Sequence, residues 1–435
     1  MMKGKIFALK GLIVHTPQPK QFTATDGYLV CENGKVKGIY ERLPEEMKSI
    51  PVADYSGRVI IPGMSDLHLH APQYGFRGMG MILDTDASWE TWFDRYAFPE
   101  ESHYSNMDYA EKAYEKFTDD LLHTTTTRIS AFATIHREAT ELLMKKLNEK
   151  GFAGYVGKVN TDRNSTEGLL ETTDESLSET SRWLSETADK YKMVKPIITP
   201  RYIPSCTDRC MEGLQKLMEE YRVPAQSHLS ENLEEIEWVK SLKPEIDFYG
   251  QAYDMYGMLG DQIPSIMAHC IFPTDEEFEL ISRRKNLWVA HCPQSNFHSC
   301  GSAAPVRKYI EAGVHVGLGT DMAGSPTLNM LRAVFDCSIA SRIYWAANER
   351  NDNPHAVKTY LSLPEAFYLA TKGGGSFWGK VGSFEEGYDF DAVVIDDRTL
   401  HDLNERPILM RMERIISTCD ERHIKAKFIA GNQIL

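Results

Sequence analysis

Short apolar runs alternate with longer amphipathic stretches through the middle of the chain, from about residue 65 to residue 380. The apolar runs resemble buried strands in length, and the longer stretches repeat apolar residues with helical spacing. Strands that alternate with helices over such a length form a parallel sheet, which usually closes into a barrel. Helices are predicted at 107–123, 137–149, 175–192, 207–220, 275–284 and 364–371.

The two ends of the chain have a different pattern, because short β-type runs alternate there with turn residues. Asn33-Gly34 lies between two such runs near the N-terminus and is a strong hairpin signal. Near the C-terminus, residues 387–395 and 424–435 each form a strand-like run bounded by turn residues. Both ends therefore contribute to one β-rich unit beside the barrel.

The predicted fold class is α/β, with a distorted (β/α)8 TIM-type barrel and a small β-sandwich domain formed by the N- and C-terminal segments. We expect the barrel to span residues 65–379 and the β domain to combine residues 1–64 with 380–435. The chain has 435 residues, of which 42% are hydrophobic and 25% charged, so it can bury a large core.

Charge and cysteine content narrow the classes of partner. The formal net charge of −14 argues against nucleic acid or an anionic membrane as a partner and suits a small neutral or cationic substrate. The N-terminus has no long apolar segment and the eight cysteines include no Cys-x-x-Cys, so we expect a cytoplasmic protein with reduced thiols.

Four apolar, strand-like runs end in residues that commonly bind metals. The first ends in His68 and His70, whose imidazoles share one face of an extended strand. The other three end in His228, His269 and Asp321. Because the carboxyl ends of barrel strands converge on one mouth, the sequence predicts a metal centre there.

Metal chemistry suggests roles for two carboxylates. A divalent ion with imidazole and carboxylate ligands lowers the pKa of a bound water to about 7, which makes hydroxide available at neutral pH. Asp321 suits the acceptor of the water proton, and Glu231, three residues beyond His228, suits the donor to the substrate. Glu231 could instead be a helix-start carboxylate, and the ligand types suit both zinc and iron.

The order of these motifs resembles the amidohydrolase superfamily over essentially the whole chain. The pattern comprises His-x-His after Pro-Gly-x-x-Asp, single histidines at 228 and 269, Ser295-Asn296, and Gly-Leu-Gly-Thr-Asp321. No strand lysine stands out as a bridging ligand, so the mononuclear deaminase branch is the most similar. Narrower segments resemble the guanine deaminase family, namely His70-Ala-Pro-Gln73-Tyr74, Trp92 to Glu100, Pro200-Arg201-Tyr202 and His228-Leu-Ser-Glu231.

This resemblance implies one divalent metal ion per subunit, Zn²⁺ in the first instance with Fe²⁺ as the alternative, and a homodimer. The implied ligands are His68, His70, His228 and Asp321. His269 is expected near the reacting water, where it would act with Glu231 and Asp321 in catalysis.

The implied substrate is guanine, read by Gln73 and Arg201, with Tyr202 and His228 also in the substrate site. A phenylalanine is commoner than Tyr202 in the family, although the ring is retained. Guanine presents a planar edge of donors and acceptors, which an amide and a guanidinium can match.

The expected reaction is hydrolytic deamination of guanine to xanthine and ammonia. Glu231 would protonate the ring nitrogen beside the attacked carbon, and His269 would stabilise the new oxygen. Two alternatives stay open. One is another aminohydrolase of this architecture, acting on a triazine, a pterin, or an adenine or cytosine derivative. The other is a catalytically silent binding protein, although such proteins typically lose metal ligands.

Overall fold

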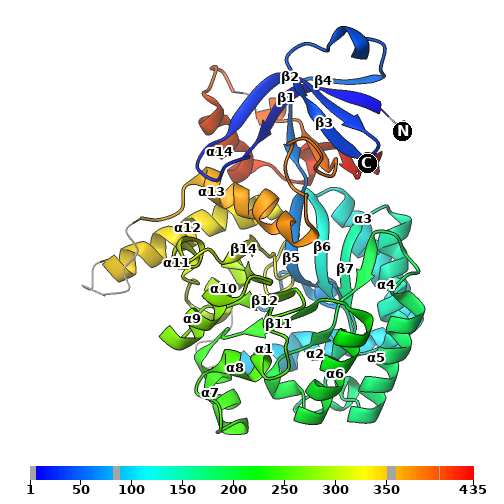
Figure 1. Ribbon diagram of the computed structural model, residues 1–435, viewed down its shortest axis with the longest axis vertical. Helices are drawn as coiled ribbons and strands as arrows, with labels where there is room; N and C mark the ends of the chain where they lie inside the picture. The colour runs from blue at the N-terminus through cyan, green and yellow to red at the C-terminus, as the bar shows by residue number, and fades with distance from the viewer. Residues whose placement is uncertain (1–5, 82–88, 350–358, 401) are drawn as a thin grey trace.

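The computed structural model describes residues 6–81, 89–349, 359–400 and 402–435 (Figure 1). An eight-stranded parallel sheet forms one part of the molecule, and a seven-stranded sheet forms a separate part above it in the view of Figure 1. Strands from both ends of the chain build the smaller part. The predicted architecture, a (β/α)8 barrel beside a β domain from both termini, is confirmed.

The barrel strands pair in chain order. They are β5 (Met64–His70), β6 (Thr126–Phe132), β7 (Ala153–Gly157), β9 (Val194–Pro196), β11 (Ala225–Leu229), β12 (Ser265–His269), β13 (Leu287–His291) and β14 (His315–Leu318). Leu318 lies opposite Asp66, which joins the last strand to the first. A parallel bridge between Ile198 and Ala225 joins β9 to β11, so the barrel is closed. Two short strands, β8 (Val159–Asn160) and β10 (Thr199–Pro200), pair near its mouth.

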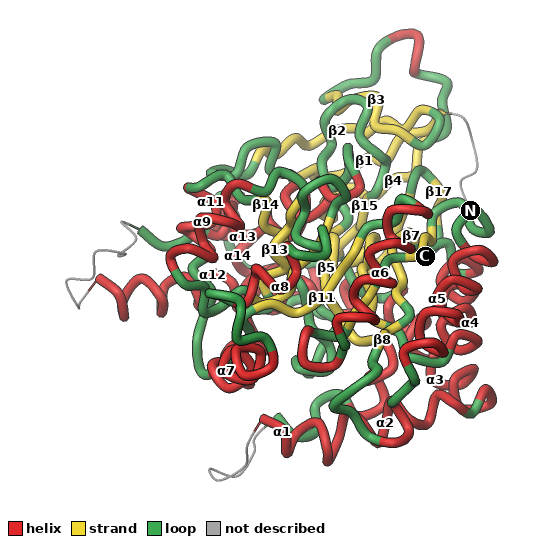
Figure 2. The backbone as a smooth tube through the Cα atoms, turned by 60° about the horizontal axis from the view of Figure 1, so that its bottom comes forward, coloured by secondary structure: helices red, strands yellow, loops and turns green. Residues whose placement is uncertain are grey.

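Helices surround the barrel strands, as Figure 2 shows. Their bounds are α3 (Met107–Leu122), α4 (Arg137–Glu149), α5 (Thr173–Thr187), α6 (Asp208–Tyr221), α7 (Leu233–Leu242), α8 (Tyr249–Asp254), α9 (Asp275–Arg283), α10 (Pro293–Cys300), α11 (Val306–Glu311), α12 (Met330–Glu349) and α13 (Leu363–Tyr368). All six predicted helices are present. The largest shift is in α5, which begins two residues earlier than expected because Thr172 and Glu175 form a capping box, and which ends at Thr187 instead of residue 192.

In the described part of the chain, three further α-helices are not part of the ring of helices around the barrel. Between β5 and α3, the chain forms α1 (Trp89–Trp92), a π-helical turn (Phe93–Ala97) and α2 (Phe98–Ser102). Near the C-terminus, α14 (Ile408–Thr418) packs against α12. Among the described residues, no helix is both long and apolar enough to cross a bilayer.

The smaller sheet has the order β17-β16-β15-β4-β1-β2-β3. The strands are β1 (Ile6–His15), β2 (Thr23–Glu32), β3 (Lys35–Tyr40), β4 (Val52–Pro62), β15 (Ala392–Ile395), β16 (Ile424–Ile429) and β17 (Asn432–Gln433). Asn33 and Gly34 have φ of 53° and 80°, which confirms the predicted hairpin between β2 and β3. The predicted domain boundaries, at residues 64 and 380, stay predictions.

Two of the connections between the smaller sheet and the barrel bear on the strand that carries His68 and His70. Only Gly63 separates β4 from β5, so one nearly continuous ribbon runs from the sheet into the barrel. Below the barrel mouth, Arg128 of β6 reaches the sheet and donates to Asp391 at 2.6 Å and to Asp389 at 2.9 Å. The strand that carries His68 and His70 is therefore anchored at its lower end.

Candidate metal centre and substrate pocket

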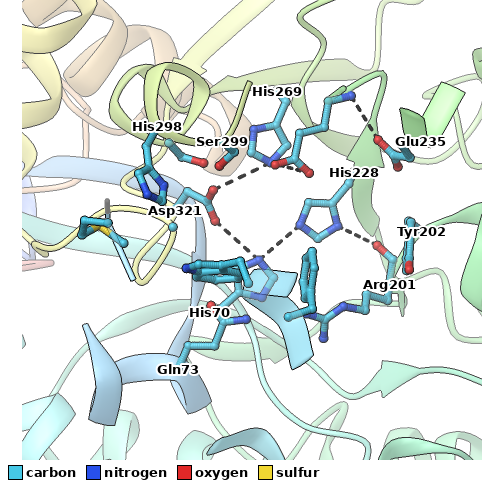
Figure 3. A pocket seen from close by; sticks show the side chains of 16 residues that line it. His70, Gln73, Arg201, Tyr202, His228, Glu235, His269, His298, Ser299 and Asp321 are labelled. Atoms are coloured by element: carbon cyan, nitrogen blue, oxygen red, sulfur yellow. Dashed lines mark hydrogen bonds and ion pairs between the residues drawn. The ribbon is translucent and has the colours of Figure 1, made fainter. Parts of the chain in front are cut away.

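The five ligand-type residues predicted from the strand ends come together at the barrel mouth. Figure 3 shows four of them, His70, His228, His269 and Asp321. Asp321 Oδ1 lies 3.2 Å from His68 Nε2 and 3.5 Å from His70 Nε2. His228 Nε2 lies 3.2 Å from His70 Nε2, and His269 Nε2 lies 3.9 Å from Asp321 Oδ2. All five side chains are buried.

The imidazoles are oriented as metal ligands require. His228 Nδ1 lies 2.6 Å from the Arg201 carbonyl oxygen, and His269 Nδ1 lies 2.9 Å from Asn296 Oδ1. The Arg201 carbonyl oxygen accepts a hydrogen bond from His228 Nδ1–H, so the lone pair of that ring lies on Nε2, which faces the cluster. The buried Nε2 atoms of His68 and His269 have no hydrogen-bond partner in the described chain. The donor set therefore fits a divalent cation.

The charge states also suit metal binding. Burial, followed by the neighbouring imidazoles, holds the pKa of His70 and of His228 well below the ordinary value, and burial lowers the pKa of His68. Burial alone would raise the pKa of Asp321, but the imidazoles of His68, His269 and His70 outweigh it and hold that pKa far below its ordinary value. Neutral imidazoles around an ionised carboxylate are ready to ligate.

The backbone is strained where the strands end. His269, Cys270 and Asp321 have φ of 72°, 48° and 49°, and Ser230 next to Glu231 has φ of 48°. Non-glycine residues rarely adopt this left-handed region, and they persist there only where the surrounding structure holds them. These conformations turn the side chains of His269 and Asp321 toward the common centre.

A buried carboxylate beneath the cluster supports it. Asp66 accepts from the Thr320 hydroxyl at 2.6 Å, from the Thr320 N–H at 2.9 Å and from the His68 N–H at 3.3 Å. Asp66 thus ties the loop that carries Asp321 to the strand that carries His68. The motif Pro-Gly-x-x-Asp contained this residue, but its position within the motif did not indicate its partners.

Glu231 lies across the cluster from the His-x-His pair. Its Oε2 atom lies 3.7 Å from His269 Nε2, and burial raises the pKa of Glu231 above its ordinary value. Helix α7 begins only at Leu233, with Asn232 as its N-cap, so Glu231 stands outside the helix and lines the pocket. Glu235, which the sequence reasoning missed, accepts from the Tyr249 hydroxyl at 2.7 Å, and burial followed by the charge of Glu231 raises its pKa to about 8.

A cavity of about 240 Å³ opens beside the cluster. Every predicted substrate residue, Gln73, Arg201, Tyr202 and His228, lines this cavity. Its other lining residues are His70, Met81, Trp92, Phe93, Glu231, Glu235, His269, Ser295, His298, Ser299, Asp321 and Gly324. One cavity is therefore lined by His70, His228, His269 and Asp321 of the metal-ligand cluster and by the predicted recognition pair.

The recognition pair meets at a carboxylate that the sequence reasoning did not select. Glu101 of α2 accepts from Gln73 Nε2 at 2.7 Å and from Arg201 Nη1 at 2.8 Å. The Arg201 guanidinium also lies over the rings of Phe93 and Phe98, at 5.3 and 5.4 Å from their centroids. Glu101 directly follows a segment that was noted for its resemblance, and that proximity was the one available signal.

Comparison with known proteins now identifies the family. The profile of the Amidohydrolase family matches residues 59–434. The chain belongs to this family.

Guanine deaminases are among its relatives over nearly the full length of the chain. The guanine deaminase of Dictyostelium discoideum is 36% identical, with both chains covered completely. The guanine deaminase of Escherichia coli (strain K12) is 31% identical, over 94% of this chain and 91% of the relative. The crystal structure of guanine deaminase from C. acetobutylicum, with bound guanine in its active site, superposes with a TM-score of 0.93 at 43% identity, covering 99% of this chain and 100% of that one. By sequence and by structure, the chain groups with the guanine deaminases.

Proposed function

We propose that this protein is a guanine deaminase, which converts guanine and water into xanthine and ammonia. The observation that carries the proposal is the shared cavity, where a metal-ligand cluster lies beside an amide and a guanidinium held by one carboxylate. The full-length similarity to guanine deaminases supports the same substrate.

The proposed ligands of one divalent ion are His68, His70, His228 and Asp321, whose donor atoms converge as described above. When bound, such an ion lowers the pKa of a coordinated water toward about 7. Zn²⁺ is the proposed ion, and Fe²⁺ suits the same imidazole and carboxylate donors.

The residues around the cluster move protons at defined points. Asp321, whose pKa is depressed, accepts the proton that the attacking water loses. Burial raises the pKa of Glu231, so this residue holds a proton. It gives that proton to the guanine ring nitrogen beside the attacked carbon as negative charge develops on that nitrogen. His269 lies 3.7 Å from Glu231 and 3.9 Å from Asp321, where its N–H can stabilise the developing oxygen anion.

The bond changes balance without a further reactant. The water oxygen bonds to the ring carbon that carries the exocyclic amine, and the bond from that carbon to the amine nitrogen then breaks. The proton held by Asp321 passes to the departing nitrogen, so ammonia leaves. The remaining hydroxyl proton returns to Glu231, which restores its protonated form, and the oxygen stays as the carbonyl of xanthine.

Gln73 and Arg201 orient the substrate. The guanidinium of Arg201 donates to the carbonyl oxygen of guanine, and the amide of Gln73 can both donate and accept along the neighbouring edge. Tyr202 and His228 border the same cavity. A homodimer and a cytoplasmic location are proposed with this function, because the family resemblance implies the first and the cysteine pattern, which favours reduced thiols, suits the second.

An ultraviolet assay of guanine loss by the metal-reconstituted protein tests the proposal. The kcat/KM for guanine is expected to exceed that for adenine, cytosine, a pterin and a triazine in the same panel. Ammonia release in equal amount confirms hydrolysis. A higher kcat/KM for any other member of the panel would replace guanine as the substrate, and metal-loaded protein that releases no ammonia from any member would contradict an enzymatic role.

A further inference from the structure

Glu101 has no role in the proton transfers above, yet it is one of the most enclosed charged groups at the pocket. Its side chain is 3% exposed and that of Arg201 is 5% exposed. Its Oε1 atom accepts from Gln73 Nε2 at 2.7 Å and from Arg201 Nη1 at 3.1 Å, and its Oε2 atom accepts from the same Nη1 at 2.8 Å. One carboxylate therefore connects both members of the recognition pair.

An ionised carboxylate can only accept hydrogen bonds. The NH₂ end of the Gln73 amide must therefore face Glu101, which leaves the Oε1 end of the amide on the opposite side, 3.5 Å from the Ala323 N–H. A glutamine amide is symmetric in shape but not in its donors and acceptors, so its direction decides which substrate edge it matches. Glu101 sets this direction.

Arg201 is held by the same carboxylate and by two aromatic rings from the same segment. Both bonds to Glu101 use Nη1, so this carboxylate does not occupy Nε or Nη2. Phe93 and Phe98 lie against the guanidinium, which restricts its plane. Burial alone would lower the pKa of Arg201, but the charge and hydrogen bonds of Glu101 raise it, so the cation is retained in a buried site.

We propose that Glu101 is the positioning residue for substrate selectivity, which fixes the donor–acceptor direction of the Gln73 amide and the placement of Arg201. This inference rests on the proposed function for the identity of the substrate. The selected edge is a ring N–H beside a carbonyl oxygen, as in guanine. An analogue with the reversed edge is 2,6-diaminopurine, which has an amine donor beside an unprotonated ring nitrogen and keeps the amine that the enzyme would remove.

Glu101→Gln provides the sharpest test, because it keeps the shape and replaces one acceptor with a donor. At the Oε2 position the new NH₂ would face only Arg201, which cannot accept, so it is expected at the Oε1 position. There it gives up the longer 3.1 Å contact with Arg201 Nη1, and the Gln73 amide is expected to reverse so that its oxygen accepts. We expect kcat/KM for guanine to fall about 100-fold and the preference for guanine over 2,6-diaminopurine to fall at least about 10-fold. Calorimetric binding of xanthine, which keeps the selected edge, against 2,6-diaminopurine measures the same preference without turnover.

Glu365→Gln is the matched control. Glu365 forms a bidentate pair with Arg307 at 2.9 and 3.0 Å, with side chains 9% and 8% exposed, and neither residue lines the cavity. This variant also removes a buried carboxylate from an arginine, so it measures the effect of lost stability alone. We expect it to keep the wild-type preference within about twofold.

Glu101→Asp keeps a group that only accepts hydrogen bonds, and it tests the positioning role of Glu101 if Glu101→Gln does not fold. It is expected to turn over guanine more slowly while keeping the preference within about threefold of wild type. An unchanged preference in folded Glu101→Gln, or a preference lost in Glu101→Asp, would overturn the role of Glu101. Wild-type protein that binds xanthine but does not turn over guanine would overturn the proposed function instead, and the binding preference would still test Glu101. Wild type that binds neither purine would overturn both.

Discussion

The metal-ligand cluster and the recognition pair lie in one cavity but are positioned in different ways. Each cluster ligand lies at the end of a barrel strand or one turn beyond it, so the hydrogen-bonded strand ladder sets its place. Gln73 lies on the short 3-10 helix after β5 and Arg201 on the segment after β10, and Glu101 from α2 holds both side chains. The backbone of the barrel strands thus positions the metal-ligand residues, whereas side-chain contacts between distant segments position the residues that would select the substrate.

The largest expected effect follows from removing the cluster. His70→Ala, or exhaustive treatment with a chelator, should reduce guanine turnover by more than about 10⁴-fold, since either change removes the ion that activates the attacking water. Metal content by elemental analysis and turnover by ultraviolet absorbance check this outcome. Re-addition of Zn²⁺ should restore the chelated wild type but not the variant. Turnover that survives complete metal loss would contradict the assignment of the cluster.

Glu231→Gln should have the next largest effect, because it removes the proton donor and keeps the shape. Turnover is expected to fall by about 10³- to 10⁴-fold, with metal content and xanthine binding close to wild type. Glu234→Gln, on the adjacent helix α7 and outside the cavity, is the control and should be near wild type. Near-normal turnover by Glu231→Gln would exclude its assigned role.

Arg201→Lys tests the other side of the comparison. A lysine keeps the charge but loses the planar fork that can serve Glu101 and the substrate together. We expect kcat/KM for guanine to fall by about 10²-fold, mainly through KM, while metal content is unchanged. Steady-state kinetics with elemental analysis would show this. A variant that loses its metal would mean that the two regions are not independent.

The pH dependence of turnover is expected to show the smallest effect, and it tests whether the recognition pair influences the proton transfers at the metal-ligand cluster. Glu231 acts in its protonated form, so activity is expected to fall as pH rises through its raised pKa. Asp321 acts in its ionised form, and its depressed pKa keeps it ionised at lower pH. Arg201→Lys should lower the height of the kcat/KM profile without moving its alkaline limb. A limb that moves in Arg201→Lys would show coupling between recognition and proton transfer.

The barrel and the cluster could be predicted from the sequence because each signal was local. His68, His228 and Asp321 each end an apolar run, and in a parallel barrel the ends of such runs meet at one face. The hairpin at Asn33-Gly34 was equally local, since turn geometry alone demands those residue types.

The support of the recognition pair could not be predicted in the same way. Glu101 follows Glu100 in a short helix, and nothing local shows which of the two carboxylates faces the pocket. The structure buries Glu101 against Arg201, one hundred residues away, while Glu100 accepts from the Tyr109 hydroxyl instead. Likewise, Glu235 was hidden among four acidic residues at the start of α7. Such choices depend on how helices pack over the mouth, which is tertiary information.

The ribbon from β4 into β5 has a consequence for the order in which the protein matures. β4 lies between β1, made before it, and β15, made more than three hundred residues later. During synthesis, one edge of β4 lacks its partner strand until residues 392–395 have left the ribosome. We therefore expect the strand that carries His68 and His70 to be anchored fully only near the end of translation, and the proposed metal site to be completed late in maturation.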